Sequence, residues 1–513
     1  MAHNLHPTTT SALTNKVISY PFGVPLAKAF ATDLLKQFQH NPLDLAGVTI
    51  WVPSRRAALS LENALLALRP SGLVLPAIKP LHLTEEDAEL LAFEATQLLE
   101  GAKAPVSEYA RLFYLARQVL VWQRAAGLNS SSIAHAFESA ASLASLSDKL
   151  RTQNVTFESL TKSIPPDMAH HWELNLTFLK IVFEHYPGWL QEQKALDPAD
   201  FRIGLIMAQA QAYEKNPPPN PTYFVGFTDT TPAGVALMQT VLTSQDAHMV
   251  LQGFDAALAT QTLPPSHPHF GINRLLTTLS ISPEDVHCVG EPTPQGALLL
   301  QSQAPSGHTG VWLEKTLPPT CAEGLTLIEV PNQRLEADTI ALIMRKTLES
   351  PKQTCALVTT DRQLAARVAD QLQHWEITVN DSAGTPLLTT TAGSFFMLLS
   401  HVVASGFKPQ IVAQLLAHPL AFCGMAKADW KKATRLFEAE ILRGVTPGYG
   451  LAGLRQKVAE TSERLKEKTS QNIQHLETIL AKLEDFTAPL RQQKKLNLAD
   501  WIKAHIDVGK MFA

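Results

Sequence analysis

The chain has 513 residues and a formal net charge of −4 at pH 7, with 45% hydrophobic and 18% charged residues. Because domains usually hold roughly one to two hundred residues, a chain of this length should contain several structural units. The composition is ordinary for a globular protein, and the small negative charge excludes a strong positive field over the whole surface. Any contact with nucleic acid must therefore come from a local groove.

Targeting and cysteine patterns favour a cytoplasmic protein that does not contact a membrane. Met1–Lys16 is polar and has no apolar core of a signal peptide, and no run of about 18 apolar residues predicts a transmembrane helix. Four reduced thiols are expected, since no CxxC pair exists; a zinc or iron–sulfur site built from them is the less favoured alternative. The four cysteines are Cys288, Cys321, Cys355 and Cys423.

The chain begins with alternating strand and helix patterns, which predict a parallel α/β sheet. A proline-glycine turn, Pro21-Phe22-Gly23, follows the first strand, and Ser54 is a candidate N-cap for the second helix. The apolar spacing changes to a helical period near Thr84 and returns to strands after Pro217–Pro221. The expected strands are Lys16–Tyr20, Val48–Val52, Leu73–Ile78, Tyr223–Phe227 and Ala247–Gly253, and the expected helices include Leu26–Phe38 and Ala233–Leu242.

A second α/β pattern follows a stretch rich in Pro, Ser and Thr, which we expect to be mostly irregular. Its expected strands are Leu325–Val330, Cys355–Val358 and Ile377–Val379, and its expected helices are Arg334–Glu349 and Asp361–His374. From Gly393 onward the pattern is helical.

Two α/β lobes, each interrupted by a helical insertion, follow the plan of superfamily 1 helicases, which is an analogy of fold alone. The predicted fold class is α/β, with two such parallel-sheet lobes, the second incomplete. The predicted domains are 1–83 with 217–255 (first lobe), 84–216 (helical insertion), 256–320 (irregular connector), 321–390 (second lobe) and 391–513 (second helical insertion, truncated).

The motifs of a helicase motor and of a nuclease are missing from the sequence. A P-loop needs glycines, a lysine and a Ser/Thr hydroxyl after a strand, whereas the sole Gly-Lys pair is Gly509-Lys510, followed by Met511. Asp229 follows a predicted strand without a second acid, so we interpret it as a turn or cap residue rather than a metal ligand. Glu85-Glu86-Asp87 precedes a helix, not the strand that a PD-(D/E)xK nuclease requires. We predict no ATPase or nuclease activity of this chain's own, although its status as an enzyme stays open.

Six stretches, in order, resemble the AddB family of double-strand-break repair proteins, in its alphaproteobacterial type. They are Val17–Pro25 (VISYPFGVP), Val48–Ala58 (VTIWVPSRRAA), Leu75–Asp87 (LPAIKPLHLTEED), His171–Val182 with Ala195-Leu196-Asp197-Pro198, Ala356–Asp361 with Asn380–Leu387, and Leu416-Ala417-His418-Pro419-Leu420. Each is weak alone, and the resemblance covers nearly the whole chain but about half of the family's usual length.

The resemblance implies a non-catalytic subunit that channels DNA and forms a heterodimer with an AddA-type helicase–nuclease. Single- and double-stranded DNA ends would be its ligands, in homologous recombination. The family's C-terminal half carries a PD-(D/E)xK nuclease with an iron–sulfur cluster and Mg²⁺. Because the chain stops at Ala513, we expect no cofactor, metal or ATP in this chain, and we interpret it as a truncated or split product.

Candidate DNA contacts lie where strands meet helices, since helix N-termini and arginines hold phosphates. The alternative for each is a solvated helix start or an ordinary turn. The candidates are Arg55, Arg56, Thr359, Thr360, Arg362, Asp381, Ser382 and Gly384. Two rival hypotheses remain: a stand-alone protein-interaction module without a DNA role, and a degenerate remnant that aggregates.

Overall fold

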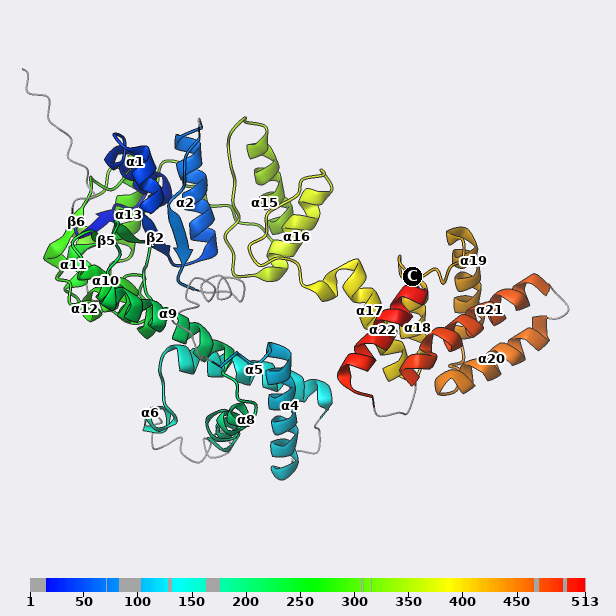
Figure 1. Cartoon of the computed structure of the whole chain (residues 1–513). Helices are drawn as coiled ribbons and strands as arrows, with labels where there is room; N and C mark the ends of the chain where they lie inside the picture. The colour runs from blue at the N-terminus through cyan, green and yellow to red at the C-terminus, as the bar shows by residue number, and fades with distance from the viewer. Residues whose placement is uncertain are drawn as a thin grey trace, which may run out of the picture. The chain divides into compact units, whose positions relative to one another are not determined.

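The computed structural model describes residues 15–70, 72–82, 103–127, 132–162, 176–305, 307, 309–314, 316–465, 470–491 and 496–512. The chain divides into two compact units, Met1–Leu327 and Ile328–Ala513 (Figure 1). Among the described helices, none combines the length and apolar character that crossing a membrane requires.

The first unit contains all six described strands and is built around one sheet. Its strands are β1 (Val17–Tyr20), β2 (Thr49–Val52), β3 (Ala77–Pro80), β4 (Thr222–Val225), β5 (Ala247–Gln252) and β6 (Val286–Cys288). Its helices are α1 (Leu26–Gln37), α2 (Arg55–Leu68), α4 (Glu108–Ala125), α5 (Ile133–Thr152), α6 (Phe157–Lys162), α8 (Tyr186–Glu192), α9 (Pro198–Lys215), α10 (Pro232–Leu242), α11 (Ala256–Ala259), α12 (Phe270–Thr278), α13 (Pro294–Ser302) and α14 (Val311–Glu314).

The sheet is parallel throughout, in the order β3-β2-β4-β5-β1-β6, which confirms the predicted α/β class. Strands β1, β2, β4 and β5 are mostly buried on both faces, and their side chains alternate between two cores, whereas the edge strands β3 and β6 are partly exposed. Ile18, Ile50 and Tyr223 face the core that α1 and α2 cover. Trp51 and Phe224 face the opposite core, to which α9, α10 and α12 contribute. The Trp51 side chain is buried in this core.

In the described residues, the segments between β3 and β4 are helical, and α9 connects them to the sheet. Leu205 and Ile206 of α9 belong to the same core as β4 and β5. The start of α9 instead meets α5 through Arg151 and Asp200. The insertion has a core of its own, formed by α4, α5 and the segment around Tyr186.

The segment 256–320 is more regular than the sequence predicted. Helices α11, α12 and α13 form here, and β6 joins the edge of the sheet next to β1. The prediction of an irregular connector was wrong because β6 has only three residues, Val286–Cys288, too few for a visible alternation.

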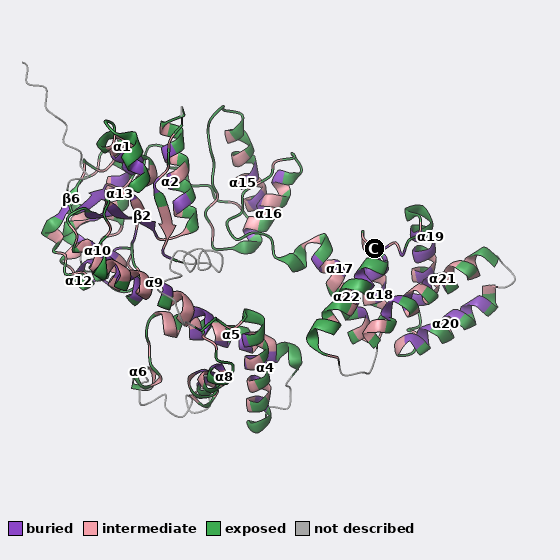
Figure 2. Cartoon of the chain, in the orientation of Figure 1, coloured by how far each residue is buried: buried purple, intermediate pink, exposed green. Residues whose placement is uncertain are grey.

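The second unit is helical in its described residues. Its helices are α15 (Gln333–Leu348), α16 (Arg362–Gln373), α17 (Thr391–Ala404), α18 (Pro409–Leu416), α19 (Lys427–Phe437), α20 (Gly450–Leu465), α21 (Ser470–Thr487) and α22 (Leu498–Phe512). Helices α17 to α22 surround one apolar core that includes Phe395, Trp430, Phe437 and Phe512. Buried positions that face this core and exposed positions both occur along these helices, as Figure 2 shows.

The second predicted sheet does not form. Leu325–Val330, Cys355–Val358 and Ile377–Val379 carry no strand and no bridge, although the helices predicted beside them, α15 and α16, are present. Leu357, Ile377 and Val379 pack partly against these two helices. Val358 is 94% exposed on the other side of its segment. Apolar, β-branched residues gave a strand pattern here, but a strand also needs a neighbour with which to pair.

Candidate functional site

The carboxyl edge of the parallel sheet is the first place to look for a site, since open α/β sheets bind ligands there, at a topological switch point. The switch point here lies between β1 and β5. From β1 the chain crosses to β2 in one direction along the sheet, whereas from β5 it crosses in the opposite direction to β6. The turn Pro21–Pro25 follows β1 directly.

Side chains of the protein itself fill the crevice after β1. Phe22 contacts the ring of His269 edge-on, with the ring centroids 6.1 Å apart. Gly253, which follows β5, has a left-handed φ of +68°, and a Cβ there would overlap the Phe22 ring. Gly296, in the first turn of α13, allows that helix to approach the carbonyl oxygen of Phe22 equally closely.

Hydrogen bonds hold this filled crevice in place. His269 donates from Nε2 to the Gly253 carbonyl (2.7 Å), and Gln252 donates to the Val24 carbonyl (2.9 Å). Thr293 accepts a hydrogen bond from Gly296 N and so caps α13. The neighbouring His267 also contacts a backbone carbonyl, that of Gln303 (2.6 Å).

The residues at this crevice do not fit a nucleotide. The turn offers neither the lysine nor the hydroxyl of a phosphate cradle, and the Phe22 ring occupies the space beside β5. At the end of β4, Asp229 accepts a hydrogen bond from Thr230 N and pairs with Arg274. Asp229 therefore lies in the irregular segment between β4 and α10, and Thr231 is the residue that caps α10.

Arg55 and Arg56 follow β2 at the same edge of the sheet, and β5 and β4 lie between β2 and β1. They are the first two residues of α2, and Ser54 caps the helix by accepting a hydrogen bond from Ala57 N (3.3 Å). Both arginines are exposed. Lys79 of the neighbouring strand β3 lies over the Trp51 ring, 5.9 Å from its centroid. Three cationic side chains are thus carried by β3 and the start of α2.

In the second unit, two segments that the sequence singled out separately meet. Arg362, the first residue of α16, donates from Nη1 and Nη2 to the two carboxylate oxygens of Asp381 (3.1 and 2.6 Å). This hydrogen bond raises the pKa of Arg362, and its charge is largely offset. Thr359 and Asp361 hold the start of the helix.

Asp381, Ser382 and Gly384 lie in a turn, and Thr360 lies just before α16. Ala383 N donates to Asp381, and Gly384 has a φ of +66°. Thr360, Ser382 and Gly384 are exposed. Asp381 closes the turn onto Arg362, which favours a structural role for this pair.

The sequence analysis missed a buried charged cluster inside the helical insertion. Asp197 is fully buried, accepts a hydrogen bond from Tyr186 (2.8 Å) and caps α9 through Ala199 N (2.7 Å). Arg111 Nε lies 3.5 Å from Asp197, and its Nη2 lies 2.7 Å from Asp148. Burial would lower the pKa of Arg111, but these two carboxylates raise it.

The Asp197 cluster gives a structural role to one of the six stretches that resemble the AddB family. In Ala195-Leu196-Asp197-Pro198, the aspartate is the N-cap and Pro198 is the first helical residue. Leu196 pairs with Pro105 in a short bridge. The only signal in the sequence was the Asp-Pro pair, because Arg111 and Tyr186 come from distant segments.

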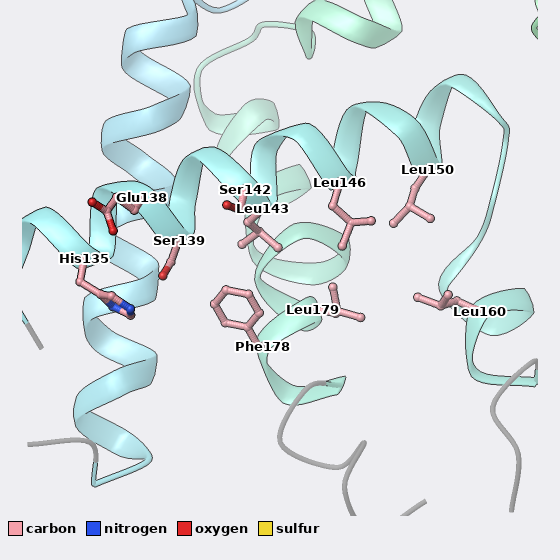
Figure 3. A pocket seen from close by; sticks show the side chains of 10 residues that line it. All are labelled: His135, Glu138, Ser139, Ser142, Leu143, Leu146, Leu150, Leu160, Phe178 and Leu179. Carbon is pink, nitrogen blue, oxygen red and sulfur yellow. The ribbon is translucent and has the colours of Figure 1, made fainter. Parts of the chain in front are cut away.

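An apolar cavity of about 600 Å³ also lies in the helical insertion (Figure 3). Leu146, Leu150 and Leu160 line one end, and Phe178 lies opposite α5. His135 and Glu138 stand at the other end, where His135 contacts Gln123 (3.3 Å). The lining is predominantly apolar, and it offers no chemistry that links it to the edge of the sheet.

The cysteines are free thiols, two exposed (Cys288 and Cys355) and two buried (Cys321 and Cys423). Burial raises the pKa of Cys423 to about 12. Within the described ranges, no three His, Cys, Asp or Glu side chains gather closely enough to hold a metal ion. The predicted acidic cluster Glu85-Glu86-Asp87 lies outside the described residues.

Comparison of the sequence with protein-family models and with curated proteins finds no match.

Proposed function

We propose that this chain is a non-catalytic, DNA-channelling and scaffold subunit of an AddAB-type helicase–nuclease complex. Its partner would be an AddA-type subunit, and its work would lie in double-strand-break repair in the cytoplasm. Support for this proposal comes from the six ordered sequence stretches, a parallel sheet interrupted by a helical insertion, and a filled switch-point crevice.

The observation that carries the proposal is the position of Arg55 and Arg56. Cations at a helix N-terminus oppose the helix dipole, at a cost of about 0.3–1 kcal/mol each. Both arginines nevertheless stand at the first two positions of α2 and are exposed. The same N–H groups and dipole attract anions, so a phosphate bound at this helix start would lie close to both exposed side chains. Polyanion binding is consistent with the position of these two arginines.

Replacing both arginines, Arg55→Ala with Arg56→Ala, should weaken binding of single-stranded DNA by the full chain. The slope of log K against log salt concentration should flatten by about one to two units, since about 0.7 of a counterion is released per single-strand phosphate neutralised. Fluorescence anisotropy with a labelled oligonucleotide at several salt concentrations measures this.

A matched control removes two positive charges elsewhere in the first unit. Lys28 on α1 and Arg69 at the other end of α2 are exposed, so Lys28→Ala with Arg69→Ala changes net charge equally. Equal salt slopes for the arginine variant and this control would reject the assignment of Arg55 and Arg56. Folding should not limit the test, because removing cations from a helix N-terminus favours the helix.

A second candidate function, a protein-interaction module, has one observation in its favour. Several apolar side chains of the second unit are exposed, among them Val358 (94%), Leu387 (74%) and Leu388 (60%). Exposed apolar surface of this kind is typical of interaction sites. This function predicts that oligonucleotides do not bind in a salt-dependent manner.

A further inference from the structure

A groove in the second unit lies between α18 and α19 and has a volume of about 380 Å³. Its floor is apolar and fixed: Trp430 is buried and donates from Nε1 to the Leu416 carbonyl (3.1 Å). His418 and Pro419, from the Leu-Ala-His-Pro-Leu stretch, form part of the wall. Burial and this hydrogen bond therefore hold the floor of the groove in place.

Three cations line one wall of this groove. Lys427, Lys431 and Arg435 are exposed and are spaced four residues apart on α19, so they lie along the same face of the helix. Each step of four residues advances about 6 Å along the helix axis. Like charges at this spacing destabilise an isolated helix by about 0.2–0.5 kcal/mol per pair, so helix stability does not explain the row.

The charges around the groove are also unbalanced. From Ser382 to Phe437 the sequence has five basic residues and one acidic residue, Asp429, whereas the whole chain is net negative. Glu438 lines the groove, but Arg443 pairs with it at 2.7 Å. Lys427 lies over the Phe422 ring, 5.8 Å from its centroid, at the same groove. A row of cations beside an aromatic ring and an apolar floor is the arrangement that holds single strands.

From this arrangement we infer that the α18–α19 groove binds the phosphate backbone of single-stranded nucleic acid, with Lys427, Lys431 and Arg435 as the contacts. The inference rests on the proposed function but assigns a site separate from Arg55 and Arg56. A single strand fits better than an acidic peptide, because its phosphates recur at regular intervals and its bases can stack on Phe422.

The test uses the full chain with a fluorescein-labelled twenty-nucleotide oligo-dT and a triple variant, Lys427→Ala, Lys431→Ala and Arg435→Ala. The affinity should fall at least about tenfold at moderate salt, and the salt slope should flatten by about two units, for three single-strand phosphate contacts. The control variant removes three exposed lysines of the same unit that do not line the groove, Lys432→Ala, Lys503→Ala and Lys510→Ala. It should bind nearly as the parent does.

The other possible outcomes contradict either the inferred site or the proposed function. If the parent binds oligo-dT and the two triple variants bind equally, the groove is not the site, while the proposed function stands. If the parent does not bind oligo-dT, the proposed function fails together with the inference. If a polyglutamate of the same length competes as well as unlabelled oligo-dT, and only through these three residues, the groove holds an acidic protein segment instead.

Discussion

Replacing Asp197 with alanine should destabilise the helical insertion of the first unit by about 3–5 kcal/mol, the usual cost of leaving one partner of a buried ion pair uncompensated. Arg111, which is 3% exposed, would lose Asp197 and would retain Asp148 as its ion-pair partner among the described residues. The hydroxyl of Tyr186 would lose its acceptor, and α9 would lose its N-cap. These losses act on one cluster, so they are not independent.

Hydrogen exchange of peptides from α4, α5 and α9 measures the loss of stability within the helical insertion itself. A local reading is preferable because a chain with two compact units need not unfold in a single transition. Protection in these peptides should fall, while peptides from the second unit should be unchanged.

Asp200→Ala serves as the control, because it removes a carboxylate one turn further along the same helix. Its side chain is 38% exposed and pairs with Arg151. A partly exposed pair of this kind contributes about 0–1 kcal/mol. Equal losses of protection for the Asp197 and Asp200 variants would contradict a stabilising role for the buried cluster.

Gly253→Ala should destabilise the first unit by about 2–5 kcal/mol, from a left-handed φ (about 1–2 kcal/mol) and from crowding of a packed site (about 1–3 kcal/mol). The added methyl group would overlap the Phe22 ring, which lies across the end of β1. Hydrogen exchange of β1 and β5 measures the loss.

Two further variants separate crowding from backbone strain. Gly290 has a φ of +78°, but a methyl group on its Cα would meet no other atom within 4 Å, so Gly290→Ala should cost only the backbone strain. Adding Phe22→Ala to Gly253→Ala should recover part of the loss, as a favourable coupling in the double-mutant cycle. If Gly253→Ala costs no more than Gly290→Ala, the crevice is not filled by Phe22.

Much of the first sheet could be predicted, because its strands are short apolar runs between clear turn and cap residues. Ser54 does cap α2, and β1, β2, β4 and β5 lie within one residue or two of their predicted positions. The third strand begins later than predicted, at Ala77, because Pro76 has no N–H for the ladder. Ala77 N is the first to donate, to the Val48 carbonyl (2.9 Å).

Contacts between distant segments could not be predicted from local patterns. The Arg362–Asp381 pair joined two segments that the sequence had singled out separately. The Arg111–Asp197 cluster depends on the fold of the helical insertion, and Phe22 gave no signal that it would fill the crevice. The sequence analysis did not single out Lys427, Lys431 and Arg435, since their grouping gains meaning from the groove beside α19.

The most direct test of the central claim is the affinity of the purified full chain for single-stranded oligo-dT, measured across salt concentrations. We expect log K to fall linearly with log salt concentration, with a slope of several units, because the charged contacts release about 0.7 of a counterion for each phosphate. Binding that does not change with salt, or no binding even at low ionic strength, would contradict a DNA-channelling role and favour the protein-interaction module.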